Sequence, residues 1–125
     1  MDTVISVVQI VLALGFAVTG LLKLTQPYAK LVKLPGAAWV NDFSPEIIRL
    51  IGVLEVCAAV GMIVPLLLHS LTMLTPLAGV GLALLMSGAM ATHLRRAEYR
   101  HITANLIYLG LALFVAYGRL VGFAG

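Results

Sequence analysis

The stretch LIGVLEVCAAVGMIVP, residues 50–65, is apolar enough to lie in a lipid bilayer, yet it carries one carboxylate, Glu55, near its middle. An ionised carboxylate near the hydrocarbon core costs about 2.5–3.5 kcal/mol on membrane-insertion scales, so the group needs a partner or a proton. The stretch therefore predicts a membrane helix and, within it, a polar site around Glu55.

The composition of the whole chain is that of an integral membrane protein. Of its 125 residues, 62% are hydrophobic and 10% are charged, and the mean hydropathy is +1.09. A soluble domain needs more charge than this to solvate its surface. Although the net charge is +3, no soluble basic face is available, so we do not expect nucleic acid as a partner.

Four segments are long enough to cross a hydrocarbon core about 30 Å thick, which takes roughly 20 apolar residues in a helix. Residues 3–22, 70–92 and 102–118 contain no Asp, Glu, Lys or Arg, and residues 50–68 contain only Glu55. With their ends added, the predicted spans are about 3–24, 46–68, 70–93 and 101–119. They predict an all-α integral membrane protein whose residues 1–125 form a single domain with four transmembrane helices.

The basic residues are distributed unevenly over the connecting segments. Only Arg119 lies on the side of the termini, where we expect it to contact lipid headgroups, and the other seven lie at the first and third loops: Lys23, Lys30, Lys33, Arg49, Arg95, Arg96 and Arg100. By the positive-inside rule, these loops, residues 25–45 and 94–100, face the cytoplasm and both termini face outward. We expect the protein in a bacterial cytoplasmic membrane.

The first loop contains three local signals. PYAKLVKL, residues 27–34, favours a short helix lying in the membrane interface. Ser44, followed by Pro45 and Glu46, indicates the start of the second span, with Ser44 as its N-cap. Trp39 lies between them, and it is either an aromatic anchor at the interface or a lid on a cavity.

Helical periodicity places small and polar residues on one face of each span. Such faces associate in lipid, because small residues allow close approach and polar groups bond across the contact. The predicted bundle interior consists of Gln9, Ala13, Phe16, Gly20 and Lys23; Gly52, Glu55, Ala59 and Met62; Gly79, Ala83, Met86, Met90 and His93; and His101, Asn105, Tyr108, Ala112, Val115 and Arg119.

Polar members of these faces are predicted to converge near the inner leaflet. Lys23 and His93 end two spans at the cytoplasmic boundary, whereas Glu55 and Asn105 lie about 7 Å and about 5 Å beyond it. Because helical side chains lean toward the N-terminus, all four approach one layer, with Tyr108 one turn deeper. We predict that these five residues form a ligand-binding or structural polar layer. Glu55 is either paired with Lys23, or neutral and hydrogen-bonded to Asn105 or Tyr108.

No motif in the sequence points to independent catalysis. We find no nucleophile elbow, no phosphate-binding loop and no set of metal ligands at suitable spacing. The single cysteine, Cys57, excludes an intrachain disulfide and is expected to be a buried packing residue. Catalytic residues therefore remain unassigned, and no metal or resident cofactor is predicted.

Four segments, in their order and spacing, resemble the DoxX-like family of small four-helix membrane proteins: GFAVTGLLKL (15–24), SPEIIRLIGVLEVCAAVGMIVP (44–65), LMSGAMATHLRRAE (85–98) and NLIYLGLALFVAYGR (105–119). The resemblance implies an up-down bundle in which Lys23, Glu55 and His93 occupy the family's recurring polar positions. The family takes its name from a membrane subunit of a thiosulfate:quinone oxidoreductase, and distant eukaryotic relatives assist assembly of membrane receptors. Quinone is therefore the ligand that the resemblance suggests.

Three functions remain open. We favour a non-catalytic membrane subunit, or a binder of a small lipophilic ligand such as quinone, with its site around Glu55. The first alternative is a membrane enzyme, either a quinone-linked oxidoreductase component or an isomerase, that uses Glu55 and His93 as acid and base. The second is a membrane-protein assembly factor in which Glu55 only fixes the helix register. Small residues on the spans also permit a homo-oligomer or a complex with another membrane subunit.

Overall fold

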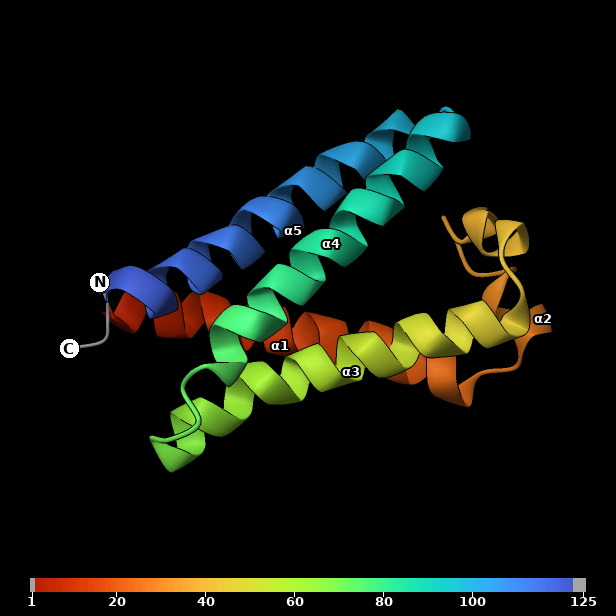
Figure 1. Ribbon diagram of the computed structural model, residues 1–125. Coiled ribbons are helices and arrows are strands. Elements are labelled where there is room, and N and C mark those ends of the chain that lie inside the picture. Colours follow the sequence, from red (N-terminus) through yellow and green to blue (C-terminus); the bar gives the residue numbers. More distant parts are fainter. Residues whose placement is uncertain (1, 123–125) are drawn as a thin grey trace.

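The computed structural model describes residues 2–122, and four long helices dominate it (Figure 1). They are α1 (Asp2–Thr25), α3 (Pro45–Leu68), α4 (Leu74–Arg95) and α5 (Tyr99–Tyr117), and a π-helical turn, η2 (Gly118–Gly122), continues α5. All four are long and apolar enough to cross a membrane. The prediction of a four-helix integral membrane protein is confirmed.

The third span begins later than predicted, at Leu74 and not at residue 70. His69 and Leu71 both have positive φ angles, of 54° and 57°. This left-handed conformation ends α3 and cannot continue a right-handed helix. Residues 69–73 consequently form a loop between α3 and α4.

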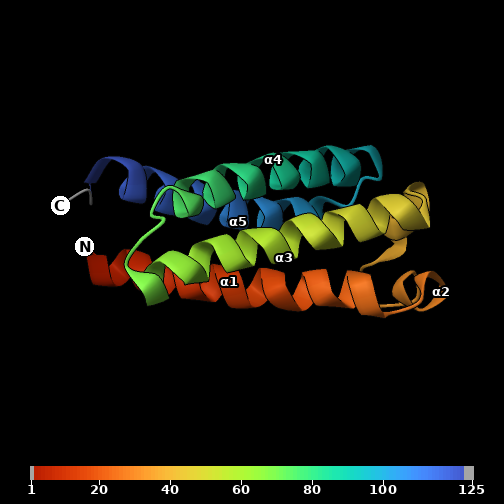
Figure 2. The same cartoon turned by 60° about the horizontal axis from the view of Figure 1, so that its bottom comes forward.

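The helices form two antiparallel pairs, α1 with α3 and α4 with α5. Figures 1 and 2 show both termini and the α3–α4 loop at one end of the molecule, which we call the terminal end. The first loop and the α4–α5 turn lie at the other end, which we call the basic end. The two pairs cross near the terminal end and diverge toward the basic end (Figure 1).

Glycines allow close backbone contact within each pair. A Cβ atom on Gly20 would lie 2.8 Å from the carbonyl oxygen of Gly52, which joins α1 to α3. A Cβ atom on Gly79 would lie 2.9 Å from the carbonyl oxygen of Ala112, which joins α4 to α5. Real Cβ atoms do not come this close, so only glycine fits at these contacts, and each pair is a tightly packed unit.

The predicted interior faces are largely buried. On α1, α3 and α4, all predicted interior residues are buried except Lys23 and Met90, which are half-buried. The face of α5 is buried at Ala112 and Val115, but Tyr108 is 42% exposed. Because the pairs diverge at the basic end, this part of α5 borders an open gap.

The first loop folds back onto the basic end. It contains a short helix, α2 (Tyr28–Leu31), within the segment predicted to be helical, and a 3₁₀ helix, η1 (Ala38–Asp42). The Tyr28 hydroxyl donates to the carbonyl oxygens of Val40 and Phe43, at 2.9 and 2.6 Å. As predicted, the Ser44 Oγ caps α3 by accepting from the Ile47 N–H, at 3.3 Å.

The expected contact of Arg119 with lipid headgroups and the expected burial of Cys57 are wrong, whereas the interior face predicted to include Arg119 agrees with its position. Arg119 turns into the bundle, where its guanidinium donates to Gln9 Oε1 at 2.9 Å and to Ser6 Oγ at 2.8 Å. Cys57 is exposed and not buried. It follows Glu55 by two residues, or about 200° around the helix, and therefore faces away from the interior.

Candidate functional site

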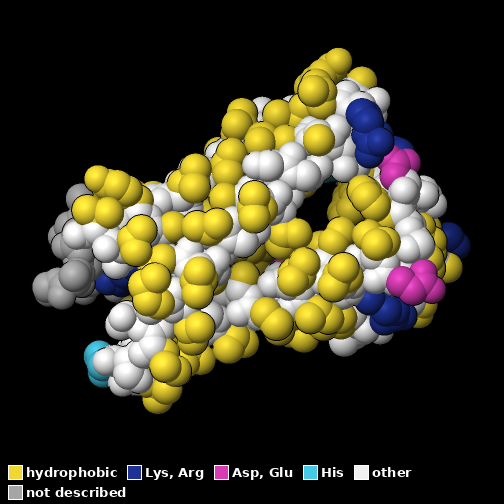
Figure 3. Space-filling model, in the orientation of Figure 1, with side chains coloured by type: hydrophobic (Ala, Val, Ile, Leu, Met, Phe, Trp, Pro, Cys, Tyr) yellow, Lys and Arg dark blue, Asp and Glu magenta, His cyan; other side chains and the backbone are white. Residues whose placement is uncertain are grey.

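A cavity of about 520 Å³ lies between the two helix pairs toward the basic end. Figure 3 shows the surface hollowed at this position between α3 and α4. The cavity is of the size that proteins use for small-molecule ligands. All six sequence-predicted site residues line it: Lys23, Trp39, Glu55, His93, Asn105 and Tyr108.

Glu55 is paired inside the α1–α3 unit. Its side chain is buried, and its Oε1 atom lies 2.8 Å from the Lys23 Nζ atom. The hydroxyl of Thr19 donates to the other carboxylate oxygen at 3.0 Å. The Gly20–Gly52 contact brings α1 and α3 together beside these side chains. The sequence predicted either an ion pair with Lys23 or a neutral Glu55 hydrogen-bonded to α5, and the structure shows the ion pair.

His93 is oriented by Glu98 from the α4–α5 turn. The His93 Nδ1 atom lies 2.8 Å from Glu98 Oε1. Because an ionised carboxylate only accepts hydrogen bonds, Nδ1 carries the hydrogen. The imidazole also stacks on His101, with ring centroids 4.7 Å apart, and meets the edge of Trp39 at 6.1 Å. These contacts fix the ring at the wall of the cavity.

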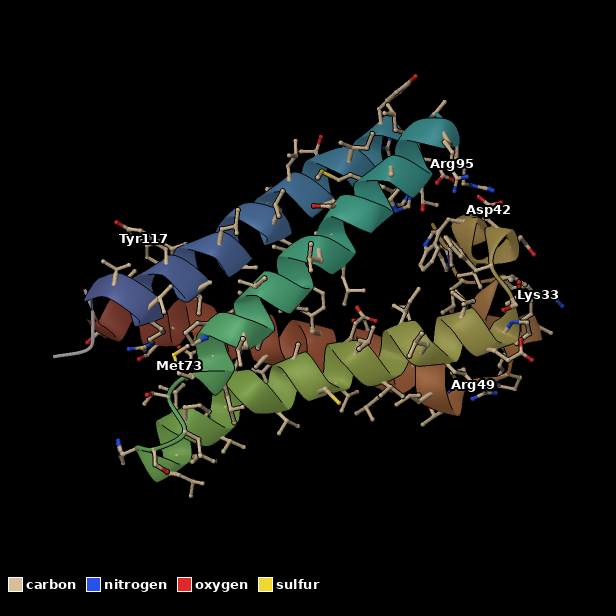
Figure 4. The ribbon with its side chains drawn as sticks, viewed as in Figure 1. Lys33, Asp42, Arg49, Met73, Arg95 and Tyr117 are labelled. Atoms are coloured by element: carbon tan, nitrogen blue, oxygen red, sulfur yellow. The ribbon has the colours of Figure 1, made fainter. Side chains whose placement is uncertain are left out.

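An ion pair closes the basic-end opening between η1 and the α4–α5 turn, which we call the mouth. Arg96 Nη1 lies 2.9 Å from Asp42 Oδ1, and Arg96 Nε lies 3.2 Å from Glu98 Oε2. Figure 4 shows Asp42 and Arg95 on the two sides of this opening, whereas Arg49 lies on the outside of α3.

The charged groups at the mouth stabilise one another. Hydrogen bonds, first with Glu98 and then with Asp42, raise the pKa of Arg96 above its ordinary value. The hydrogen bond from His93, followed by that from Arg96, lowers the pKa of Glu98 despite some desolvation. Both groups therefore stay charged at neutral pH.

Trp39 covers the cavity from the basic end. Its ring lies 5.9 Å from the Lys23 Nζ atom and 6.0 Å from the ring of Phe43. The side chain thus contacts elements on both sides of the gap, since Lys23 belongs to α1 and His93 to α4. Of the two interpretations of Trp39, this geometry favours the lid.

Asn105 presents a hydrogen-bond donor that the protein leaves unused. Its Nδ2 atom is buried and has no hydrogen-bond partner within residues 2–122. A buried donor without a partner costs about 1–3 kcal/mol, and such groups usually have a structural or functional reason. Tyr108, one turn further along α5, packs edge-on against Phe16 with centroids 5.7 Å apart. This part of the cavity therefore combines the amide donor of Asn105 with the ring of Tyr108, both on α5, and the ring of Phe16 on α1.

Sequence reasoning missed two residues that complete the site, Thr19 and Glu98. Thr19 lies one helical turn before Lys23 and so shares its face, which could have indicated a contact with Glu55. Glu98 lies outside the predicted spans, and its contact with His93 depends on the shape of the α4–α5 turn. Among the described residues, no group of three His, Cys, Asp or Glu side chains could hold a metal ion.

The fold and this site define a class, a small integral membrane protein of four helices with an ion pair at an internal cavity. The model of the DoxX-like family matches residues 7–115, and the chain belongs to that family. No curated protein and no solved structure gives a significant match.

Proposed function

We propose that this protein binds a small lipophilic ligand in the cavity around Glu55, with quinone as the first candidate, and that it acts without catalysis of its own. The observation that carries the proposal is the unused donor of Asn105, a residue that lines the same cavity as Lys23 and Glu55. A ligand with an acceptor oxygen would satisfy this donor.

The chemistry of the walls supports a quinone. A quinone carbonyl accepts hydrogen bonds, as the Asn105 amide and the Lys23 ammonium would require. A hydroquinone hydroxyl could instead donate to Glu55. The rings of Phe16, Trp39 and Tyr108 line the cavity and offer faces or edges for an aromatic ligand.

One observation favours the enzyme alternative. A histidine oriented by a carboxylate, as His93 is by Glu98, is the arrangement of many general bases. Binding ranks above catalysis in our proposal because His93 is also enclosed by two ring contacts, and Glu55 is occupied by Lys23 and Thr19. The assembly-factor alternative would use the Lys23–Glu55 pair only to fix the register of α1 and α3.

Native mass spectrometry of the gently purified full chain tests this proposal. We expect a co-purified lipophilic molecule on the wild-type protein, and its loss in Glu55→Gln and in Asn105→Leu. The second variant removes the donor without breaking an ion pair, so it separates binding from stability. Glu46→Gln is the matched control, since it makes the same chemical change in the first turn of α3, outside the cavity.

Two outcomes would contradict the proposal. An empty wild-type protein, with all variants assembled equally, would favour the assembly-factor function. A bound molecule that persists in both cavity variants would place its binding elsewhere.

A further inference from the structure

A second hollow continues from the cavity along the lipid-facing side of α3 and α4. It is a groove of about 550 Å³, and the residues that line it include Leu54, Cys57, Leu77 and Gly81. Leu84 and Leu85 line both the groove and the cavity, so the two spaces adjoin. The cavity has several polar and charged side chains set among largely apolar walls, whereas the groove is lined only by Leu, Ala, Gly and Cys residues.

The groove extends away from the basic end. On α4 it reaches from Leu85 to Leu74, about 16 Å at 1.5 Å per residue. This is about half of a hydrocarbon core 30 Å thick. Glu55 and Asn105 lie more than one helical turn inside their membrane-spanning helices, so a head bound to these two residues would lie below the lipid headgroups. A phospholipid head would not leave the interface to this extent, whereas a small head on one apolar tail would.

The open side of the cavity faces lipid and not water. At the mouth, Trp39 and the Arg96–Asp42 ion pair close the route from the basic end. Between α3 and α4 the surface remains hollowed (Figure 3), and Leu84 and Leu77 are 70% and 62% exposed. Because both helices are membrane spans, this opening lies at the depth of the hydrocarbon.

We propose that the ligand is a single-tailed amphiphile that enters sideways from the bilayer between α3 and α4, and binds with its head in the cavity and its tail in the groove. The proposal rests on the proposed function, since it takes the cavity as the site of the head. It adds the tail, its path and the direction of entry.

The head of the ligand can be followed with a residue of the protein, and its tail with a photoreactive group on the ligand. Trp39 is the only tryptophan and lines the cavity, so saturable quenching of its fluorescence reports a quinone head. The tail is followed with a benzoquinone that carries a decyl chain ending in a diazirine, with cross-linked residues mapped by mass spectrometry. Duroquinone, which has the ring without a tail, is the matched ligand. The full chain is used in lipid nanodiscs.

Gly81→Phe tests the groove directly. A Cβ atom on Gly81 would meet nothing within 4 Å, so a phenyl group enters the groove without displacing backbone. Gly110→Phe is the control, because Gly110 is equally unobstructed and lines neither space. We expect Gly81→Phe to weaken binding of the decyl probe by about tenfold, equivalent to about 1.4 kcal/mol. Quenching by duroquinone should be unchanged in both variants.

The outcomes distinguish the two proposals. Cross-links to residues 74–85 that duroquinone removes by competition would support the tail groove. Saturable quenching by both compounds, with cross-links scattered over all lipid-facing surfaces, would overturn the tail groove and leave the head site intact. No saturable quenching by either compound would count against quinone binding itself. A cross-link between two protein chains at the groove would show a second copy there and overturn the proposal.

Discussion

At the scale of single residues, Lys23 explains how Glu55 is accommodated in an apolar helix. Glu55 as a residue is 4% exposed, and the Lys23 Nζ atom on the adjoining helix offsets the charge of its carboxylate at 2.8 Å. Replacing only one member of such a pair leaves the other buried without compensation, whereas replacing both removes the cost as well as the gain.

A double-mutant cycle on Lys23 and Glu55 tests the strength of this pair. We expect Lys23→Met and Glu55→Gln each to lower the free energy of unfolding. The free energy lost in the double variant should be smaller than the sum of the two single losses by about 0.5–3 kcal/mol, the range for contacting residues. Unfolding by SDS in mixed micelles, followed by circular dichroism, gives the three values. Strictly additive losses would mean that the pair contributes no coupling.

The contacts of Glu98 with His93 and Arg96 predict that the mouth opens at acidic pH. The pKa of Glu98 is lowered in the folded protein. The ionised Glu98 therefore stabilises the folded protein above the ordinary carboxyl pKa of about 4.3, and this stabilisation is lost as the pH falls through the lower pKa of the folded protein. Below that pH its contacts with His93 and Arg96 weaken, and we expect acrylamide to quench Trp39 more strongly. Glu98→Gln should show the stronger quenching already at pH 7. If Glu98→Gln kept the wild-type profile, Glu98 would have no part in closure.

At the scale of helices, the two glycine contacts hold each pair together. We expect Gly52→Ala and Gly79→Ala each to destabilise the protein by about 1–3 kcal/mol, the usual cost of overpacking. In each case the added methyl group would lie within 3 Å of a backbone oxygen on the neighbouring helix. Gly110→Ala, which meets open space, should be neutral or slightly stabilising. Thermal unfolding in one detergent compares the three variants, and equal effects would argue against close packing as the cause.

The helices and their interior faces could be predicted from sequence because both follow from local rules. Hydropathy identifies the spans, and the helical repeat places Gln9, Glu55 and His93 on buried faces. The divergence of the pairs could not be predicted, because it depends on packing between elements distant in sequence. The same holds for the lid position of Trp39 and the contact of Glu98 with His93, since both depend on loop conformation.

At the scale of the whole molecule, a polar network joins the two pairs at the terminal end. Gln9 of α1 donates to the carbonyl oxygen of Met62 on α3 and, at 3.2 Å, to Thr75 on α4, and it accepts from Arg119. One side chain thus connects all parts of the bundle where the pairs cross. The pairs can diverge at the basic end because they are fixed at the other.

Gln9→Leu should therefore weaken the whole bundle and not one helix. We expect a loss of about 1–3 kcal/mol, because the variant removes several buried hydrogen bonds at once. SDS unfolding monitored by circular dichroism and by Trp39 fluorescence measures it. Both signals should shift together, even though Trp39 lies at the opposite end. A shift confined to one signal would show that the two ends unfold independently.

The distribution of charge predicts how the bundle lies in its membrane. Seven of the eight Lys and Arg residues lie in, or within a few residues of, the first loop and the α4–α5 turn, and the positive-inside rule predicts that this end faces the cytoplasm. In a Cys57→Ser background, Ser70→Cys at the terminal end should react with an impermeant maleimide in cells whose outer barrier is opened. Lys33→Cys at the basic end should react only after the membrane itself is permeabilised. The reverse labelling pattern would mean that the terminal end, and not the basic end, faces the cytoplasm. Because the cavity lies toward the basic end, the expected result would assign its lateral opening to the inner leaflet, and the reverse result would assign it to the outer one.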